Sequence, residues 1–393
     1  MSTVAPKALA IGIVTATYTP SRNGVATSTA LFARGLRALG HTVRVFAPAH
    51  RAAAPEPDVV RLPGLRAAAV PDYPVLLPVG PLASRRLPLD DLDVVHTMHP
   101  FVAGYLADAW ARRLQVPLVF TAHTQYHAYV HYAPTPAGVT GWATKRHVAA
   151  FARTADVVLA PGRALVDALR DYGYAGPVEA MPNPVDLAAH AGAPDPALRA
   201  RHGVPADAPL LLYVGRMASE KGLPLLLEAV ARAQRSEPRL HLLMVGDGPD
   251  RTALAAGAGP QVRWVGAVDH REVAAYVRTA DLFVSASATE VQPMTFLEAL
   301  AGGTPVVAID SAAARELAGP GLTVGGRDAD ALAHAVLAAL AAPDRAARRA
   351  AAREAVRPFD VAVRAAALAE VYARAIGARP DAHPVSRPLR PAA

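Results

Sequence analysis

Two glutamates, Glu290 and Glu298, carry the strongest chemical signal in the sequence, and seven residues separate them. The segment AspLeuPheValSerAlaSer before them is typical of a buried strand, and Pro293 fits the first position of a helix. We therefore expect Glu290 in a loop at the carboxyl end of the strand and Glu298 inside the helix. A helix N-terminus binds anions, so the pair fits a ligand with hydroxyls at both ends and phosphates between them.

A nucleotide sugar is such a ligand, although the same spacing fits a solvated loop glutamate and an ordinary helical glutamate equally well. A pair of cations supports the first interpretation. Arg216 follows Gly215 at the end of the apolar run LeuLeuLeuTyrValGly, and Lys221 precedes a helix predicted over residues 223–234. Arginine and lysine at the carboxyl end of one strand can hold a diphosphate, whereas paired cations on a solvated surface are the alternative.

Two glycine turns are further candidates for ligand contact. Gly24 follows the first predicted strand and would let a ligand approach the backbone. The segment lacks a full GlyxGlyxxGly pattern and an acidic residue at the usual distance, so we expect no nicotinamide cofactor. GlyAspGlyPro at residues 246–249 follows another strand. Either turn borders a ligand or only connects a strand to a helix.

Histidines follow a strand in the middle of the first half, at positions 123, 127 and 131. Their spacing could place three imidazoles on one helical face as metal ligands, but no carboxylate lies near them in the sequence, so we expect no metal. His123 is predicted to point into a cleft as a polar contact or proton handler. The aromatic residues beside it would shape an acceptor pocket. His96 and His99 are interpreted as loop histidines.

Two series of short apolar strands, each alternating with amphipathic helices, position these residues. Such alternation implies parallel sheets covered by helices, so we predict an α/β protein of two Rossmann-like domains whose sheets face a central cleft. The first domain is placed at residues 1–185 and the second at residues 186–360. A last helix, residues 361–376, is expected to pack back on the first domain. The proline-rich residues 377–393 are expected to be disordered.

The composition excludes several classes of protein. A chain of 393 residues is long for one core and fits two domains. It has no cysteine, which excludes disulfides and thiol catalysis. No apolar run could span a bilayer and the N-terminus does not look like a secretory signal, so we expect a cytoplasmic protein. The net charge of +7 is scattered, which disfavours nucleic acid and fits phosphorylated ligands or an anionic membrane surface.

In their order along the chain, these segments resemble the retaining glycosyltransferases of family 4, which have the GT-B fold. The resemblance rests on AsnGlyVal near the start, ValGlyArg with GluLysGly, GlyAspGlyPro, and the two glutamates followed by AlaLeuAlaGlyGlyThrProValVal. It implies a nucleotide-sugar donor, a UDP- or GDP-hexose, bound mainly by the second domain. The acceptor would bind mainly to the first domain, and neither a cofactor nor a metal is implied.

The resemblance also implies roles for the matched residues. Arg216 and Lys221 would neutralise the departing diphosphate, Glu290 would bond sugar hydroxyls, and Glu298 would bond the ribose. The acceptor would attack from the face that the leaving group vacates, and a phosphate oxygen would take the proton. The implied catalytic residues are His123, Arg216, Lys221 and Glu290. The implied donor-binding residues are Gly24, Gly215, Arg216, Lys221, Gly246, Met294, Thr295 and Glu298.

Two positions depart from the family's usual pattern. The family commonly has two glycines where this chain has Asn23 and Gly24. It commonly has glycine where this chain has Pro293, so one N–H is missing from the ligand site, while Met294 and Thr295 still offer theirs.

Within the family, HisThrMetHisPro and ThrAlaHisThrGlnTyrHisAlaTyrValHisTyr look most like the diacylglycerol glycosyltransferases and related lipid mannosyltransferases. This likeness implies a lipid acceptor, with Tyr126, His127, Tyr129 and Tyr132 as acceptor-binding residues. The apolar residues 69–78 and the basic residues of the first domain could dock on an anionic membrane, or form a buried loop and a solvated face. A soluble sugar or polyol acceptor, and a nucleotide-sugar-binding protein without catalysis, are the alternatives.

Overall fold

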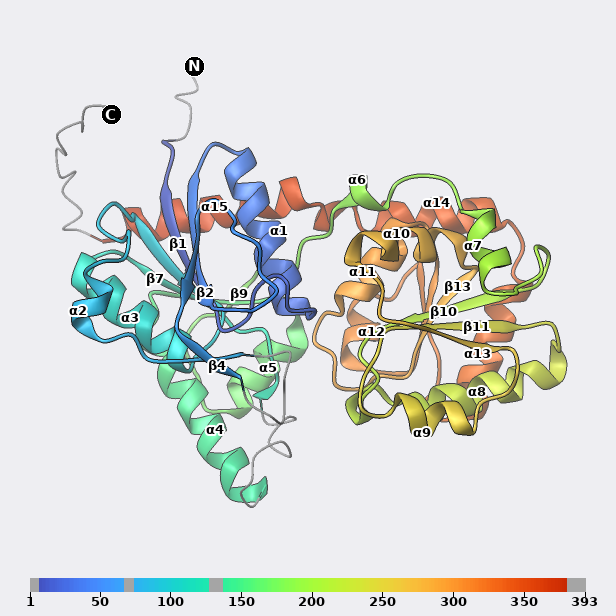
Figure 1. The fold of residues 1–393 in the computed structure, drawn as a ribbon. Helices are drawn as coiled ribbons and strands as arrows, with labels where there is room; N and C mark the ends of the chain where they lie inside the picture. The colour runs from blue at the N-terminus through green and yellow to red at the C-terminus, as the bar shows by residue number, and fades with distance from the viewer. Residues whose placement is uncertain (1–6, 67–73, 127–136, 380–393) are drawn as a thin grey trace.

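The computed structural model describes residues 7–66, 74–126 and 137–379. In this part of the chain, two sheets each lie between layers of helices, and the two units stand side by side (Figure 1). No helix among the described residues is both long and apolar enough to cross a lipid bilayer. Most of the predicted tail falls outside the described residues.

The first sheet, as described, has seven strands in the order β3-β2-β1-β6-β7-β8-β9, and all neighbours are parallel. The strands are β1 (Ala10–Val14), β2 (Thr42–Pro48), β3 (Val59–Leu62), β6 (Val94–Thr97), β7 (Leu118–Thr121), β8 (Val157–Ala160) and β9 (Glu179–Ala180). The strand order reverses between β1 and β6, which makes a crevice at their carboxyl ends where α/β proteins bind ligands. A short antiparallel hairpin, β4 (Gly64–Arg66) with β5 (Pro74–Leu76), forms a separate sheet that contacts β2.

The second sheet has six described strands in the order β12-β11-β10-β13-β14-β15, again all parallel. The strands are β10 (Leu210–Val214), β11 (His241–Val245), β12 (Val262–Gly266), β13 (Leu282–Ser285), β14 (Val306–Ala308) and β15 (Leu322–Val324). Its order reverses between β10 and β13. Most strand residues are buried because helices cover both faces, which explains their nearly continuous apolar sequences. The predicted pair of parallel sheets is confirmed.

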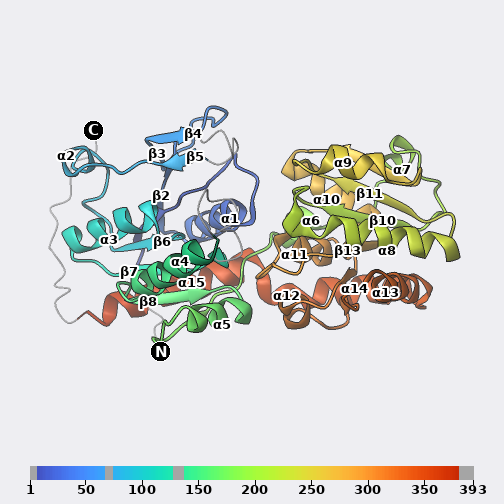
Figure 2. The same cartoon turned by 90° about the horizontal axis from the view of Figure 1, so that it is seen from below.

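Helices form layers on both faces of each sheet (Figures 1 and 2). The helices of the first unit are α1 (Gly24–Ala38), α2 (Pro81–Ser84), α3 (Val102–Leu114), α4 (Ala137–Ala152) and α5 (Arg163–Asp171). Those that follow are α6 (Leu187–His190), α7 (Pro196–Arg201), α8 (Leu223–Ser236), α9 (Arg251–Ala256), α10 (His270–Thr279), α11 (Met294–Ala301), α12 (Ala312–Glu316), α13 (Ala329–Ala341), α14 (Arg345–Ala355) and α15 (Val361–Gly377). Two short 3-10 turns, η2 (Ser219–Lys221) and η3 (Arg357–Phe359), complete the described helical elements.

At three places, an aspartate directly before a strand forms a hydrogen bond to the backbone of the neighbouring strand. Asp93 accepts from the N–H of Ala10 at 2.8 Å, and Asp156 accepts from Leu118 at 2.7 Å. Asp281 likewise accepts from Leu210 at 2.8 Å. Each carboxylate satisfies a strand-end N–H that the sheet leaves unpaired. The recurring pattern of aspartate followed by apolar residues is therefore a structural signature of these sheets.

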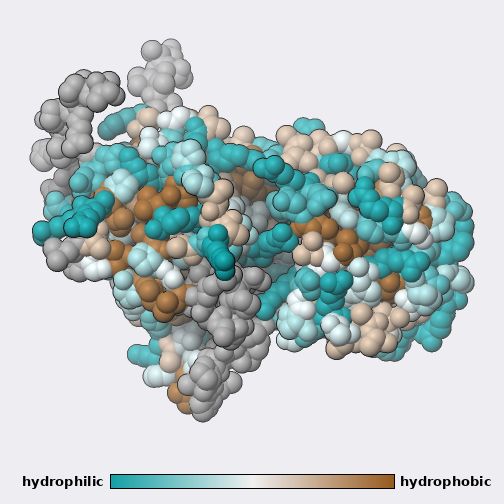
Figure 3. Space-filling view, viewed as in Figure 1, coloured by the Kyte–Doolittle hydropathy of each residue, from teal (hydrophilic) through white to brown (hydrophobic). Residues whose placement is uncertain are grey.

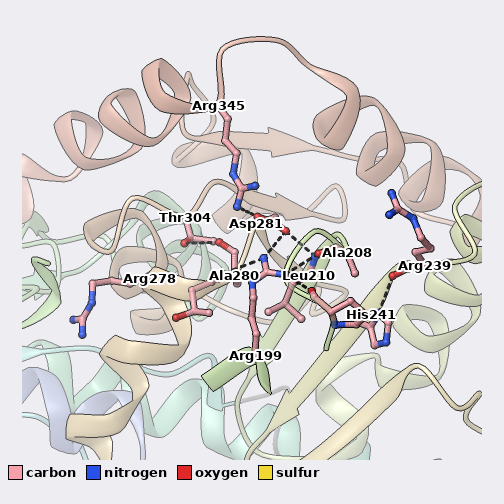
Figure 4. A network of polar contacts seen from close by, with 12 residues as sticks. Arg199, Ala208, Leu210, Arg239, His241, Arg278, Ala280, Asp281, Thr304 and Arg345 are labelled. Atoms are coloured by element: carbon pink, nitrogen blue, oxygen red, sulfur yellow. Dashed lines mark hydrogen bonds and ion pairs between the residues drawn. The ribbon is translucent and has the colours of Figure 1, made fainter. Parts of the chain in front are cut away.

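The carboxylate of Asp281 is also the centre of a network of arginines (Figure 4). Arg199 lies 2.9 Å from it, and Arg345 reaches it from α14. Burial, and then the neighbouring arginines, lower the pKa of Arg349 to about 10. The guanidinium of Arg349 donates to the carbonyls of Ala280 and of Arg278, at 3.0 and 2.6 Å. This network ties α14 to the amino-terminal edge of the second sheet.

The last helix, α15, crosses from the second unit to the first and packs against α1 (Figure 1). At Gly35 of α1, a Cβ would lie 2.6 Å from the Cβ of Ala365, so the close packing requires glycine. The hydroxyl of Tyr372 lies 2.7 Å from Nδ1 of His96, whose Nε2 lies 2.7 Å from Oγ1 of Thr121. His96 is thus a buried residue of β6, and its interpretation as a loop histidine is wrong.

Candidate functional site

The loops after β10 and β13 meet at the carboxyl edge of the second sheet. The Nζ of Lys221 forms an ion pair with Oε1 of Glu290, and the two side chains are 20% and 25% exposed. The hydroxyls of Ser287 and Thr289 donate to the carbonyl of Glu220 at 3.2 and 3.3 Å. These bonds hold the two loops together, so the cation and the carboxylate are positioned before any ligand arrives.

Glycines allow these loops to pack backbone against backbone. Gly222 has φ +63°, and a Cβ there would lie 2.3 Å from the carbonyl oxygen of Ala286. Gly246 has φ +130°, and its Cβ would lie 2.0 Å from the carbonyl oxygen of Gly215. Only glycine fits these two positions without displacing the adjoining backbone. Gly215 and Gly246, both predicted in the donor site, therefore lie next to each other.

Arg216 begins the loop that carries Lys221. The hydroxyl of Tyr213 donates to the carbonyl of Arg216 at 3.0 Å, which fixes the backbone of this residue. Burial raises the pKa of Tyr213, so its phenol remains a hydrogen-bond donor. Within the described residues no carboxylate pairs with the half-buried guanidinium of Arg216, so its charge can serve an anionic ligand.

No side chain caps the N-terminus of α11 in the described part of the chain. Pro293 is the N-cap, with φ −63° and ψ 123°, and Met294 is the first helical residue. The prediction of Pro293 as the first helical residue is therefore wrong by one position. Proline offers no capping side chain, and in the described part of the chain the N–H groups of Met294 and Thr295 have no acceptor. Two free N–H groups at a helix N-terminus form a site for an anion.

Glu298 points from the second turn of α11 and its side chain is only 5% exposed. Nε2 of His270, the first residue of α10, lies 3.7 Å from Oε1 of Glu298. His270 is not among the site residues predicted from the sequence. The sequence does contain a pattern that indicates its position. Asp269 and Glu272 form a capping box, which marks the start of a helix after β12, at the same edge of the sheet.

The first unit approaches this site through the start of α1. A Cβ on Gly24 would lie 3.5 Å from Cγ of Met294, which is ordinary contact distance. Asn23 caps α1 by accepting from Ala26 N–H at 2.9 Å, and its amide donates to Thr17. The glycine at the N-terminus of α1 thus faces the first residue of α11.

Buried hydrogen bonds link the two units beside this approach. The hydroxyl of Ser28 donates to Oδ1 of Asn183 at 2.9 Å. The backbone N–H of Asn183 donates to Oε1 of Gln292 at 2.6 Å, and its side-chain amide donates to the Gln292 carbonyl at 3.2 Å. Gln292 directly precedes the N-cap of α11, so this network sets the position of α11 relative to α1.

His123 follows β7 and lies in a group of histidines in which His96 is buried and His99 and His123 are partly buried. Its Nε2 is 3.3 Å from Sδ of Met98, and Nδ1 of His99 accepts from the N–H of Ala16 at 3.1 Å. Burial, with smaller contributions from His99 and His96, lowers the pKa of His123 to about 3. At neutral pH this imidazole is therefore uncharged and serves as a hydrogen-bonding group.

Of the predicted acceptor-binding residues, only Tyr126 is described. Its ring packs edge-on against Phe101 at 5.1 Å, and burial raises its pKa. His127, Tyr129 and Tyr132 lie outside the described residues, as does most of the predicted docking segment 69–78.

Two cavities in the second unit lie away from these residues. One of about 190 Å³ adjoins Arg199 and Asp281, and one of about 330 Å³ lies between α8 and α9. Within the described residues, no three histidine, aspartate or glutamate side chains gather in a way that could hold a metal ion. The candidate site is therefore an open edge between the units with two cations, an uncapped helix and two carboxylates.

Comparison with known proteins identifies the family. Residues 22–189 match the model for Glycosyltransferase Family 4, and residues 194–356 match that for Glycosyl transferases group 1. An alpha-monoglucosyldiacylglycerol synthase of Streptococcus pneumoniae is 32% identical over 76% of this chain and 70% of its own length. A GDP-mannose-dependent alpha-mannosyltransferase of Mycolicibacterium smegmatis is 32% identical over 79% of this chain and 82% of its own.

Solved structures agree on the fold. Anabaena Alr3699/HepE in complex with UDP and glucose has a TM-score of 0.74 at 19% identity, and covers 93% of this chain and 100% of its own. WaaG, a glycosyltransferase involved in lipopolysaccharide biosynthesis, has a TM-score of 0.68 at 20% identity, over 92% of this chain and 99% of its own. The chain thus belongs to family 4 of the glycosyltransferases, has the GT-B fold, and is a glycosyltransferase.

Proposed function

We propose that this protein is a retaining, metal-independent glycosyltransferase that moves a hexose from a UDP- or GDP-sugar to a hydroxyl of a diacylglycerol-type lipid. The observation that carries the proposal is the pairing of Lys221 with Glu290 beside the uncapped N-terminus of α11. A cation, a carboxylate and free N–H groups at one sheet edge complement a diphosphate joined to a hydroxyl-rich sugar.

In this mechanism the bond between the anomeric carbon and the diphosphate breaks, and its electrons pass to the phosphate oxygen. The acceptor oxygen bonds to the same face of the anomeric carbon, and its proton passes to that phosphate oxygen. Arg216, Lys221 and the N–H groups of Met294 and Thr295 stabilise the developing negative charge. Fixed cations in a partly buried site can supply this stabilisation without a metal ion.

The carboxylates act as hydrogen-bond acceptors. Glu290, held by Lys221, bonds hydroxyls of the hexose, and the buried Glu298 bonds the ribose. His123 is neutral at pH 7, so it bonds a sugar hydroxyl and does not supply positive charge. Gly24 lets the first unit approach the phosphates without a side chain between them.

Two kinds of relative support the choice of substrates. The alpha-monoglucosyldiacylglycerol synthases of Streptococcus pneumoniae and Acholeplasma laidlawii, the second 29% identical over 76% of this chain, support a diacylglycerol acceptor. The GDP-mannose-dependent mannosyltransferases support GDP as the alternative to UDP in the donor. The net charge of +7 is compatible with a peripheral position on the inner face of an anionic cell membrane.

A two-step experiment tests this proposal. Thermal shift with UDP, GDP and ADP, each with and without an attached hexose, identifies the donor, because a ligand of the native state raises its stability. The selected donor is then incubated with diacylglycerol vesicles, and monohexosyl diacylglycerol is sought by mass spectrometry. We expect that product with an α linkage. Transfer only to soluble sugars or polyols would overturn the lipid acceptor, and binding without transfer or hydrolysis would overturn the catalytic function.

A further inference from the structure

Exposed apolar side chains lie on helix α4, on the first turn of α3 and on Phe101 directly before α3. Four of the seven large hydrophobic side chains that are exposed among the described residues lie here. They are Phe101, Tyr105, Val139 and Trp142, with exposed fractions of 38%, 57%, 67% and 64%. The other three are scattered over separate elements. A concentration of this kind marks an interaction surface.

Helix α4 projects from the body of the first unit (Figure 1), and Figure 3 shows apolar surface on this projection. From Val139 onward, its first buried side chain is Val148. The residues before Val148 include two glycines, Val139 and Trp142, and the whole helix has no aspartate or glutamate. A helix solvated on all sides normally carries charged, strongly helix-forming residues. The exposed end of α4 therefore has the composition of a surface that an apolar partner covers.

The charges on this face complement an anionic partner. The guanidinium of Arg146 lies 5.3 Å from the centre of the Trp142 ring, and among the described residues it has no carboxylate partner. Lys145 pairs with Asp171 at 2.6 Å, which leaves Arg146 as the excess charge of the helix. Tryptophan beside a basic residue is typical of surfaces at the level of lipid headgroups.

Aromatic contacts connect this face to the acceptor side of the site. His147 of α4 stacks on Phe101 at 4.9 Å, and Tyr105 lies 5.6 Å from the same imidazole. Phe101 in turn packs against Tyr126, which follows β7 close to His123. A lipid layer on α4 would therefore lie next to the residues predicted to receive the acceptor.

We propose that α4 and the first turn of α3 dock this enzyme on an anionic lipid bilayer. Val139 and Trp142 enter the layer at the headgroup level, and Arg146 pairs with lipid phosphates. The role of this surface rests on the proposed lipid acceptor, but the binding of the protein to vesicles can be measured without any sugar transfer. Vesicle binding through α4 in a protein that glycosylates only soluble acceptors would leave the docking surface standing and remove the proposed function.

Flotation with vesicles of phosphatidylcholine and phosphatidylglycerol in equal parts tests the surface. Val139→Ser with Trp142→Ser should reduce the bound fraction about tenfold, because two apolar side chains no longer leave water. Val363→Ser, which alters an exposed hydrophobic residue of α15, should bind as the unaltered protein does. Arg146→Gln should remove the preference over pure phosphatidylcholine vesicles. Unchanged flotation of the double variant, with its nucleotide-induced thermal shift intact, would overturn the proposal.

Tryptophan fluorescence locates the contact independently. The chain has three tryptophans, and Trp142 is 64% exposed while Trp110 is 2% exposed. Vesicles should shift the emission to shorter wavelength, and Trp142→Phe should abolish the shift while flotation persists. A shift that survives in Trp142→Phe would place the contact elsewhere. A concentration-dependent dimer that the double variant loses would assign the face to a second copy of the chain and overturn the bilayer as its partner.

Discussion

Replacing Lys221 by methionine should separate catalysis from folding. The substitution keeps a long side chain and removes the charge that pairs with Glu290. Loss of one preorganised group that stabilises developing charge costs about 2.7–4 kcal/mol, so kcat should fall about 100- to 1,000-fold. The side chains of the pair are 20% and 25% exposed, so the residual carboxylate can reach water. The free energy of unfolding should therefore fall by only about 1–3 kcal/mol.

The assay measures initial rates of hexose transfer and, separately, urea unfolding of the same preparations. Arg232→Met is a matched control, because it removes a cation from surface ion pairs with Glu228 and Asp330, away from the site. This control should keep its kcat. A double-mutant cycle with Glu290→Gln should show coupling in catalysis, since the carboxylate positions the ammonium. Turnover of Lys221→Met within threefold of the unaltered enzyme would refute the assigned role of the cation.

Three other predictions follow from the same geometry. Glu298→Gln should weaken nucleotide binding by about 10- to 100-fold, as lost hydrogen bonds to a charged group would, and calorimetry with the selected nucleotide measures this. Gly24→Ala should be tolerated, because its Cβ would lie 3.5 Å from Met294, whereas Gly24→Val should raise the KM for the donor. Equal KM values for Gly24→Ala and Gly24→Val would contradict the close approach of the start of α1 to the donor site. Burial lowers the pKa of His96 and His123 to about 3 and that of His99 to about 4, below the ordinary value of 6.5. Unfolding below pH 6.5 therefore takes up protons, so the free energy of unfolding falls as the pH drops below 6.5. Each contributes up to about 1.4 kcal/mol per pH unit, and His99→Asn, which can still accept from Ala16 N–H, should flatten the slope in urea unfolding. An unchanged slope would contradict the lowered pKa of His99.

The sheets and most of the site segments could be predicted because local sequence determines them. Short apolar runs bounded by glycine or aspartate predicted the parallel strands, and the helix expected over residues 223–234 is observed as Leu223–Ser236. The Lys221–Glu290 contact follows from the same logic, since loops after neighbouring parallel strands meet at one edge of a sheet.

The contacts that could not be predicted join parts of the chain that are distant in the sequence. The buried bonds of Asn183 to Gln292 span 109 residues, and no local pattern marks either side chain as buried. The burial of His96 could not be predicted from the sequence, because its contact with Tyr372 depends on the return of α15 across the first unit. The exposure of Trp142 could not be predicted either, since a sequence does not reveal which apolar residues a fold leaves in water.

A crystal structure with the nucleoside diphosphate that gives the larger thermal shift would test the central claim most directly. The account predicts the diphosphate against Arg216, Lys221 and the N–H groups of Met294 and Thr295, with the ribose hydroxyls on Glu298. A nucleotide bound elsewhere, such as in the arginine-lined cavity beside Asp281, with the edge between β10 and β13 empty, would contradict it.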